Sequence, residues 1–451
     1  MRPRDELDDS KGRVEFLLFF PSNAIGSDTR KFFWMKVKHE DLDFAFSAVP
    51  ATQRKGFWSM LVVMLGFTFF SASMWTGVEL ANGLNLRGFL MAVGLGGIIL
   101  GAYTGALGYI GAKTGLNFDL LCHRAFGAKG SYLPSAMIAL TQIGWTGVGF
   151  AMFAYPMKEV FFAGAGDGVL WAMVILIGAC ITGSAYFGMK GLEIVSWISV
   201  PLITVLGTYA MVSATLAGGG LQAVFAKSAG SLSLFAGVGM VIGSFVSGGT
   251  STPNFVRFSR VRPAVWTTVI AFFVGNTLMF FFGGVAGAFT GKNDIFFVMA
   301  EMGLMLPAIL VLGANIWTTN DNALYTGALG LSNLTKALKR PMVLVSGALG
   351  TLFALWLYNH FCHWLTMLNA TLPSIGVILV LDFFRHKSRY LETNDETPLR
   401  QVRWGNVAGV IGGALAGNLV PWGIAAVNAM AVAALCYGAA ECLSPRQTKA
   451  V

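Results

Sequence analysis

Ten long stretches of this 451-residue chain contain no Asp, Glu, Lys or Arg. A helix needs about 20 residues to cross the roughly 30 Å hydrocarbon core of a bilayer. Two of the stretches, 341–381 and 404–440, are long enough for two crossings each, with breaks near residues 359–361 and 417–423. Each of the other eight is long enough for one: 57–78, 88–112, 131–157, 168–189, 194–226, 228–256, 263–291 and 302–320. The pattern therefore predicts twelve transmembrane helices.

The composition indicates the same class of protein. Hydrophobic residues make up 55% of the chain and charged residues only 12%, whereas a soluble domain carries about a quarter charged residues. Such a chain cannot cover itself with polar surface, so lipid must solvate much of it. Within lipid, every backbone polar group must be paired inside the protein. We therefore predict an all-α, polytopic membrane protein whose partner is the lipid bilayer.

The basic residues indicate how these helices are oriented. With the N-terminus inside, nineteen of the Lys and Arg residues after residue 50 fall on the cytoplasmic side and four on the opposite side. Cytoplasmic loops of membrane proteins carry such an excess, so both termini are predicted to be cytoplasmic. This asymmetry also accounts for the net charge of +9, because basic loops face anionic lipid. Nucleic acid is not expected as a partner.

The same charge pattern divides the chain into parts. Residues 1–50 mix charges with one short apolar stretch and predict a cytoplasmic tail. We expect translation to begin at Met35, which would make residues 1–34 an artefact of the assigned start. The other predicted parts are a ten-helix core at 51–384, a cytoplasmic loop at 385–403, helices 11 and 12 at 404–442, and a cytoplasmic tail at 443–451.

Two of the spans share an unusual composition. Gly66–Ser73 in span 1 and Gly243–Thr250 in span 6 both place glycine and hydroxyl residues in mid-span. They correspond if helices 1–5 (about 51–217) and 6–10 (about 228–384) are two repeats, the second inverted. Such paired segments indicate a transporter with discontinuous helices and a midplane site. We therefore expect helices 1 and 6 to be broken at these glycines; the alternative is that the glycines only allow close helix packing.

Span 3 contains the first candidates for binding chemistry. Gln142 and Trp145 are three residues apart and share a helix face. A tryptophan offers a flat surface for stacking, and a glutamine amide offers one acceptor and two donors. A glutamine in mid-span is informative because an unpaired amide is costly to bury in an apolar medium. The alternative for the tryptophan is that it simply fills the core.

Span 8 contains a polar stripe. Asn315, Thr318, Thr319 and Asn322 lie at helical spacing, so they must face protein or a cavity and not lipid. Their oxygens could be ligands for a small cation, or they could form a hydrogen-bonded seam between helices. Asp321 is the only acidic residue well inside a span. We expect its carboxylate to be water-exposed or paired with an asparagine, with a proton relay as the alternative.

These residue types exclude several function classes. The sequence has no phosphate-binding glycine loop with a lysine and no acid–base or nucleophile–base pair within a span, so we expect neither an enzyme nor a cofactor. The candidate site offers aromatic faces, amides and hydroxyls without a fixed charge. A flat, neutral heterocycle fits this set, because bases stack on aromatic rings and hydrogen bonds along the ring edge discriminate between them.

Four segments resemble the bacterial cytosine permeases of the nucleobase–cation symporter-1 family. They are Met64–Gly77 (MLGFTFFSASMWTG), Tyr109–Gly115 (YIGAKTG), Thr141–Trp145 (TQIGW) and Asn315–Tyr325 (NIWTTNDNALY). The resemblance runs from about Ala48 to the last helix. It implies a leucine-transporter-like fold in which a 5+5 inverted repeat is followed by two additional C-terminal helices. One departure is Asn254, where the family has an acidic residue.

The resemblance also implies the residues of two sites. The base would lie between Trp145 and Phe245, with edge contacts from Gln142, Ser244, Ser247 and Asn315. A co-transported sodium ion would be bound by backbone carbonyls of Gly66, Phe69 and Asn315 and by hydroxyls of Thr318 and Thr319.

The leading hypothesis is sodium-coupled import of cytosine by alternating access across the bacterial inner membrane. One alternative is a proton- or sodium-coupled carrier of another planar nucleobase or a hydantoin-like ring. A second alternative is a channel, which would need a continuous polar face through several spans. No obligatory protein partner is expected.

Overall fold

The computed structural model describes residues 44–226, 228–291, 295–301, 303–391 and 400–443. Within these residues the regular structure is helical, apart from one isolated bridge between Lys55 and Ser259. The predicted all-α class is confirmed. The predictions for residues 1–34 and for nearly all of the two terminal tails concern residues outside this described part.

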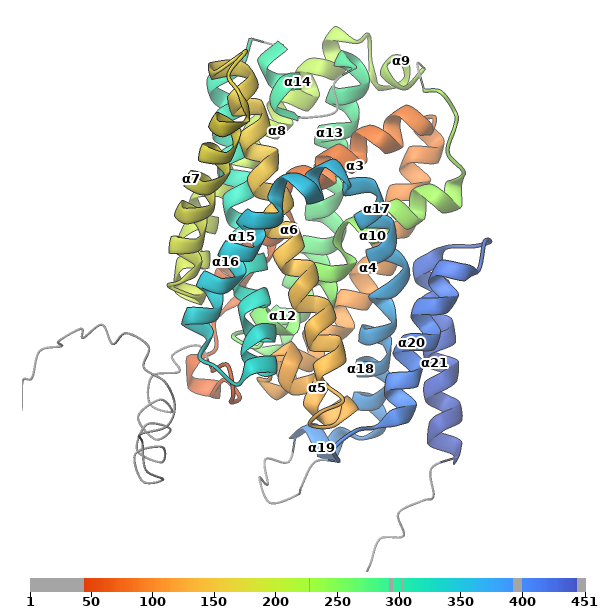
Figure 1. Ribbon diagram of the computed structural model, residues 1–451. Coiled ribbons are helices and arrows are strands. Elements are labelled where there is room, and N and C mark those ends of the chain that lie inside the picture. The colour runs from red at the N-terminus through yellow and green to blue at the C-terminus, as the bar shows by residue number, and fades with distance from the viewer. Residues whose placement is uncertain (1–43, 227, 292–294, 302, 392–399, 444–451) are drawn as a thin grey trace, which may run out of the picture. The chain divides into compact units, whose positions relative to one another are not determined.

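The first half of the described chain alternates long helices with short connecting ones (Figure 1). Its elements are η1 (Ala51–Gln53), α2 (Phe57–Thr68), α3 (Ser71–Gly83), α4 (Leu86–Thr114), α5 (Phe118–Phe126), α6 (Tyr132–Phe161), α7 (Asp167–Ala185), α8 (Met189–Ala217) and α9 (Leu221–Phe225).

The second half has the same character and ends in a helical pair. Its elements are α10 (Leu234–Thr250), α11 (Pro253–Val256), α12 (Val261–Val269), the π-helical η2 (Ile270–Gly275), α13 (Asn276–Thr290), α14 (Ile295–Glu301), α15 (Met305–Thr335), α16 (Lys339–Asn359), α17 (Phe361–Thr371), α18 (Pro373–Arg385), α19 (Lys387–Leu391), α20 (Trp404–Leu419) and α21 (Ala425–Leu443).

Local sequence signals explain where several long helices begin and end. The side chain of Asn85 accepts a hydrogen bond from Gly88 N at the start of α4, and Ser233 does the same for Ala236 N at the start of α10. Such caps satisfy backbone donors that have no partner inside the helix. Gly115 ends α4 with a φ of 74°, a left-handed conformation that glycine adopts without strain.

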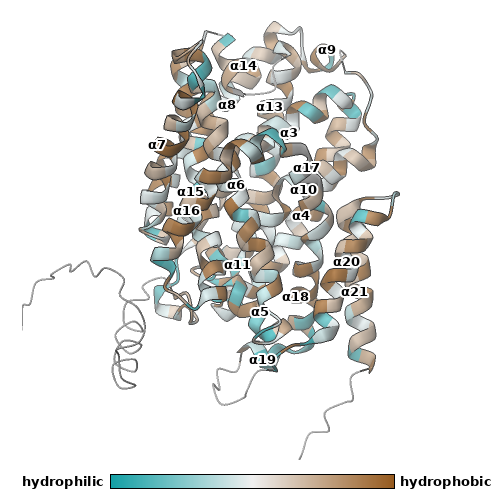
Figure 2. Ribbon diagram, in the orientation of Figure 1, coloured by the Kyte–Doolittle hydropathy of each residue, from teal (hydrophilic) through white to brown (hydrophobic). Residues whose placement is uncertain are grey.

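Most of the long helices are apolar enough to cross a membrane. Among the described residues, nine helices meet this condition by length and composition, and the bent pair α2–α3 makes a tenth if it is one span. Apolar residues dominate α7 and also the shorter α20 (Figure 2). Two further helices are outside this set: α15, which carries the polar stripe, and α20, which has 16 residues. The protein is a polytopic membrane protein, and the count of twelve stays a prediction.

Span 1 is discontinuous, as predicted, but the break is not at its glycine. The axes of α2 and α3 differ by 55°, and the two residues between them, Phe69 and Phe70, are extended. Gly66 lies inside α2, where an added Cβ would come within 2.4 Å of Ser196 Oγ on α8. This glycine therefore allows close packing, and the chain leaves the helix three residues later.

The glycines of span 6 also lie inside a helix. α10 continues through Gly243, Gly248 and Gly249 and ends at Thr250, and the short α11 follows from Pro253. An added Cβ on Gly248 would meet Phe67 at 2.7 Å, and one on Gly249 would meet Thr104 at 2.6 Å. The predicted position of this break is therefore wrong. The glycines admit neighbouring side chains, and the helix ends before proline, whose nitrogen has no hydrogen to donate.

The connections between the helices lie at two opposite ends of the bundle. α5 and α19 are at one end, the lower end in Figure 1, and α9 and α14 are at the other. At the α5 end, Lys55 forms an ion pair with Glu193 of α8, and the Ser59 hydroxyl donates a hydrogen bond to the same carboxylate. We call this the inner end, following the predicted orientation. The repeat boundaries at about 51–217 and 228–384 stay predictions.

Candidate substrate and cation site

A small buried cavity lies where the break of span 1 meets α6, α10 and α15. Its lining side chains are at most 4% exposed. Ten residues line it: Phe67, Phe70, Gln142, Trp145, Ser244, Phe245, Ser247, Gly248, Thr319 and Ala323. Five of the six residues predicted to contact substrate are among them.

Aromatic rings from three helical segments surround the cavity. The ring of Phe70 lies edge-on to Trp145, with centroids 5.6 Å apart, and edge-on to Phe245 at 6.4 Å. Phe67 lies edge-on to Phe245 at 5.4 Å. Trp145 and Phe245 were predicted from the sequence, whereas Phe67 and Phe70 were not. The Phe-Thr-Phe-Phe run around the break was the available signal for them.

The polar groups of the cavity have defined hydrogen-bonding roles. Trp145 Nε1 donates to Ser247 Oγ at 2.9 Å, which leaves the serine hydrogen available to another acceptor. The Ser244 hydroxyl donates its hydrogen to the Val241 carbonyl oxygen at 2.8 Å. The serine oxygen can therefore act only as an acceptor toward a ligand. Gln142 Nε2 is buried and has no hydrogen-bond partner among the described residues. The cavity thus offers donors at Gln142 Nε2 and the Ser247 hydroxyl and an acceptor at the Ser244 hydroxyl oxygen.

Asn315, the sixth predicted contact, is buried beside the cavity but does not line it. Its Oδ1 accepts a hydrogen bond of 2.7 Å from Ser71 Oγ, at the first residue of α3. Its Nδ2 has no partner within the described part of the chain. The side chain therefore connects α15 to the broken span 1.

Three of the predicted sodium ligands, Gly66, Phe69 and Thr319, lie together at the break of span 1. Thr319 Oγ1 is 3.0 Å from the carbonyl oxygen of Phe69 and 3.5 Å from that of Gly66. The Phe67 carbonyl, which was not predicted, is 3.4 Å away. Thr319 has one hydrogen to donate, so lone pairs in this group of oxygens remain free. Oxygen ligands of this kind suit a hard cation such as sodium.

Thr318 is joined less directly to this group. Its hydroxyl is 3.1 Å from the carbonyl oxygens of Ala314 and Asn315, both in its own helix. The Asn315 carbonyl and the Thr318 hydroxyl are therefore neighbours within α15, and their role as sodium ligands stays a prediction. Thr319 makes the hydrogen bonds from α15 to the carbonyls of Gly66, Phe67 and Phe69.

Asp321 differs from its predicted environment. It is fully buried, and its Oδ1 accepts a hydrogen bond of 2.5 Å from Ser184 of α7, whose oxygen in turn accepts one of 2.8 Å from Trp317 Nε1. The expected water-exposed or asparagine-paired carboxylate is therefore wrong. The reason is that α7 packs against α15 at this position and supplies a serine, which no local pattern in span 8 could show.

Comparison with known proteins gives the family. A model described as "Permease for cytosine/purines, uracil, thiamine, allantoin" matches residues 48–437. The cytosine permease of Escherichia coli K12 is 45% identical over 401 residues, which cover 88% of this chain and 94% of that protein.

Two solved structures share the fold. Mhp1, a nucleobase-cation-symport-1 family transporter in a closed conformation with bromovinylhydantoin bound, matches with a TM-score of 0.74 at 17% identity, over 89% of this chain and 95% of that chain. A Na⁺-coupled sialic acid symporter matches with a TM-score of 0.67 at 12% identity, over 93% and 95%. The predicted leucine-transporter-like fold and family are confirmed. The protein is a transporter and not an enzyme, and it belongs to the family of permeases for cytosine and purines, uracil, thiamine and allantoin.

Proposed function

We propose that this protein imports cytosine together with sodium, by alternating access, across the bacterial inner membrane with both termini in the cytoplasm. The observation that carries the proposal is a small, uncharged cavity with aromatic walls and an unpaired buried amide, directly beside a group of oxygens suited to a cation. The 45% identity to a cytosine permease supports the choice of base.

The polar groups of the cavity match the edge of cytosine. The amino group of cytosine is a donor, and the acceptor-only Ser244 oxygen is suited to receive it. The ring nitrogen and carbonyl oxygen beside it are acceptors, for which Gln142 Nε2 and the Ser247 hydroxyl are donors. Uracil reverses the donor and acceptor on this edge, which would leave buried groups unpaired. Asn315 lies beside the cavity, so it would affect the bound base in one of two ways. It would position Ser71, which donates a hydrogen bond to it, or it would contact the base after a rotation of its side-chain amide.

The break of span 1 offers a physical link between the two solutes. The carbonyls of Gly66, Phe67 and Phe69 face the proposed cation position, and the next residue, Phe70, places its ring in the cavity. A sodium ion on these carbonyls, held also by Thr318, Thr319 and the Asn315 carbonyl, would hold the extended residues in place and with them the Phe70 ring. Each solute would then raise the affinity for the other.

Uptake of radiolabelled cytosine into proteoliposomes tests the proposal. We expect accumulation under an inward sodium gradient and little without one. Unlabelled cytosine should compete, and uracil, adenine and hypoxanthine should compete weakly. Absence of cytosine accumulation under any cation gradient would overturn the proposal.

The second candidate is a proton- or sodium-coupled carrier of another planar ring. It is favoured by the structural match to Mhp1, which holds bromovinylhydantoin. The same assay separates the two, because labelled hydantoin or another base would then accumulate in place of cytosine. Repeating it with a proton gradient in sodium-free buffer separates the coupling ions.

A further inference from the structure

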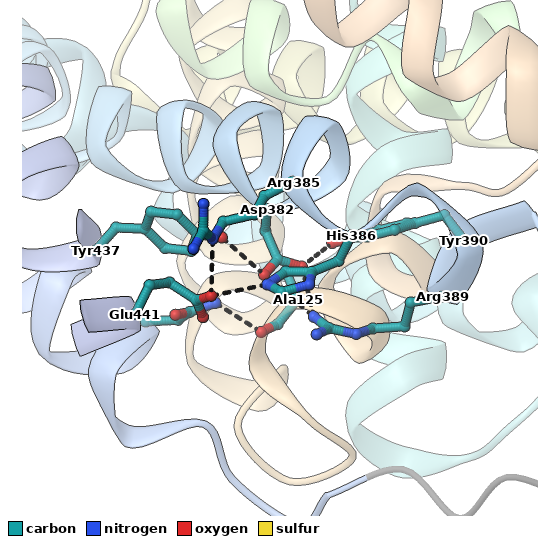
Figure 3. A network of polar contacts seen from close by, with 9 residues as sticks. Ala125, Asp382, Arg385, His386, Arg389, Tyr390, Tyr437 and Glu441 are labelled. Carbon is teal, nitrogen blue, oxygen red and sulfur yellow. Dashed lines mark hydrogen bonds and ion pairs between the residues drawn. The ribbon is translucent and has the colours of Figure 1, made fainter. Parts of the chain in front are cut away.

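The acidic side chains where α18 meets α21 at the inner end already have partners (Figure 3). Asp382 is fully buried, and Arg389 Nη1 lies 3.1 and 2.9 Å from its two oxygens. Tyr390 donates a hydrogen bond to the same carboxylate at 2.5 Å, and Tyr437 of α21 donates one at 3.3 Å. A carboxylate accepts about four hydrogen bonds, so Asp382 has no place left for a further cation.

Glu441 of α21 is the second of these acids. Its Oε2 accepts hydrogen bonds from His386 Nε2 at 2.8 Å and from Arg385 Nε at 3.2 Å. Lys387 Nζ lies 5.5 Å from the centre of the Phe384 ring, which is a cation–π contact. With the Asp382 contacts, these give a partner to every basic residue between positions 385 and 391.

Three further basic residues at this end have no such partner. Lys129 and Arg400 are exposed, and Arg403 is half-buried. Among the residues that the structure describes, none of these three side chains forms a hydrogen bond or an ion pair. Burial and the charge of Arg389 lower the pKa of the Arg403 guanidinium, although Asp382 raises it. Arginine stays protonated at any physiological pH, so a positive charge remains here that the described acids do not balance.

Backbone hydrogen bonds bring the three basic residues together. Ala128 N donates to the Arg400 carbonyl at 3.0 Å, and Arg403 N donates to the Phe126 carbonyl at 2.8 Å. Lys129 directly follows Ala128, in the loop between α5 and α6. This loop is thus joined to the segment that leads into α20. The three positions are set by the backbone, so their side chains can be changed without removing these bonds.

The three residues lie where the lipid-facing part of α20 begins. Trp404 directly follows Arg403 as the first residue of α20 and is 73% exposed, and Ile411 and Leu415 are exposed further along the same helix. Exposed tryptophans are typical of the membrane–water interface. No side chain caps the first turn of α20, so the positive end of its dipole is also available to an anion. An anion bound here would lie at the depth of the lipid headgroups.

We propose that Lys129, Arg400 and Arg403 bind the phosphate of an anionic phospholipid of the inner leaflet, with its acyl chains along the exposed apolar face of α20. Anionic lipids of the cytoplasmic leaflet attract basic residues next to membrane helices, and a guanidinium matches the geometry of a phosphate. The bound lipid would tie the loop between α5 and α6 to α20. This site goes beyond the proposed function and depends on neither cytosine nor a coupling ion.

Titration of the delipidated full-length protein with phosphatidylglycerol in a neutral detergent tests the site. We expect native mass spectrometry to detect a retained phosphatidylglycerol molecule. The unfolding temperature should rise with lipid concentration, because a ligand of the folded state stabilises it. Phosphatidylcholine, which has no net charge, should do neither. In R400Q combined with R403Q, the lipid concentration that gives half of the rise should increase about tenfold, since hydrogen bonds between charged groups are lost.

Two other arginines provide a matched control. Arg260 and Arg262 are exposed at the start of α12, close in sequence to Trp266, which is 62% exposed. R260Q combined with R262Q removes the same charge beside an exposed tryptophan, and its lipid titration should match that of the unaltered protein. Inorganic phosphate without lipid should not raise the unfolding temperature, because it has no acyl chains to place along α20.

Three results would overturn the lipid site. They are an unchanged titration in R400Q combined with R403Q, an equal loss in the control pair, and an equal rise with inorganic phosphate, which would assign the site to a free anion. Neutralising the acids at 392, 395 and 396 should leave the titration unchanged; lipid binding only after that change would give the arginines to this acidic segment. If the double variant does not fold, R400Q alone, at an exposed position, should show a smaller loss. None of these measurements uses cytosine or sodium, so failure of the proposed function would not affect them.

Discussion

At the scale of residues, the break of span 1 positions a carbonyl oxygen and an aromatic ring at two adjacent residues. Phe69 is extended and turns its carbonyl toward Thr319, while Phe70 is extended and turns its ring toward Trp145 and Phe245. In a regular helix the Phe69 carbonyl would be bonded within the helix and unavailable. The break therefore frees an oxygen for a cation and positions a ring for a planar solute.

Trp145→Ala should abolish measurable cytosine binding while the protein still folds. Stacking of a base on an aromatic side chain contributes about 1–3 kcal/mol, and the variant also removes the donor that orients Ser247. Isothermal titration of the purified variant measures this. Trp266→Ala, at a tryptophan that is 62% exposed on α12, is the control and should bind normally. Equal affinity in both variants would contradict the site.

Thr319→Ala should raise the sodium concentration needed for half-maximal uptake by about tenfold, because one oxygen near the proposed ion is lost. Thr318→Ala should raise it as well, and by less, since its hydroxyl bonds within its own helix. Thr319→Ser keeps the oxygen and should restore the original dependence. The measurement is initial uptake against sodium concentration. An unchanged curve for Thr319→Ala would reject this cation position.

At the scale of elements, the cavity depends on how closely α2 approaches α8. Gly66 of α2 lies so near Ser196 of α8 that even a methyl group would overlap with it. The carbonyl of the same glycine faces Thr319. Packing of two helices and the position of a cation ligand are therefore set at one residue.

Gly66→Ala should destabilise the protein by about 1–3 kcal/mol, as overpacking of a tight contact generally does. It should also weaken sodium dependence, because α2 must shift away from α8 and the Gly66 carbonyl must shift with it relative to Thr319. Ser196→Gly removes the overlapping side chain, so the double variant should recover part of both losses. Thermal unfolding and sodium-dependent uptake measure the two effects. If Ser196→Gly gave no recovery, the overlap would not be the cause.

At the scale of the whole molecule, the segment before η1 crosses the inner end of the bundle. Arg257 Nη1 donates to the Phe44 carbonyl at 2.6 Å, Asn117 Nδ2 donates to the Ala45 carbonyl at 2.7 Å, and Val49 N donates to the Gly115 carbonyl at 2.9 Å. Arg257 also donates to the Tyr325 hydroxyl of α15. These bonds hold the segment against the inner end of the bundle.

Asp119 of α5 should make the stability of this end depend on pH. Burial raises the pKa of its carboxyl from 3.8 to about 6, although the Ser135 hydroxyl and the charges of Arg257 and Lys336 lower it. The folded protein therefore keeps a proton that the unfolded chain has lost, and stability falls as pH rises between these values, by at most about 3 kcal/mol.

Thermal unfolding in detergent between about pH 4 and pH 7 measures this dependence. Asp119→Asn keeps the shape of the side chain without a charge, so its stability should decrease less as pH rises. His123→Gln, one turn along α5, removes a neighbouring titratable group and should leave the fall between these pH values in place. If the stability of Asp119→Asn decreased with pH by the same amount, the pH dependence would belong to another titratable group.

The sequence by itself determined the class of protein, most of the spans and the residue types of the site, because each depends on local properties. The length of an apolar run decides whether a helix can cross lipid, and residues at helical spacing share a face. Gln142, Trp145 and Thr319 could therefore be identified within single helices. The resemblance to a family added Ser244, Phe245 and Ser247 on another helix, and all three line the cavity.

Only the tertiary structure decided what those residues meet. The glycines of spans 1 and 6 lie inside helices, where they leave room for Ser196, Phe67 and Thr104. Asp321 is bonded to a serine from α7, and Asp382 to a tyrosine from α21. Each of these partners is more than fifty residues away in the chain, and a long-range pairing leaves no trace in the periodicity of either segment. The cavity is formed by such long-range contacts. Its lining residues could therefore be identified from the sequence, but their arrangement around the cavity could not be predicted from it.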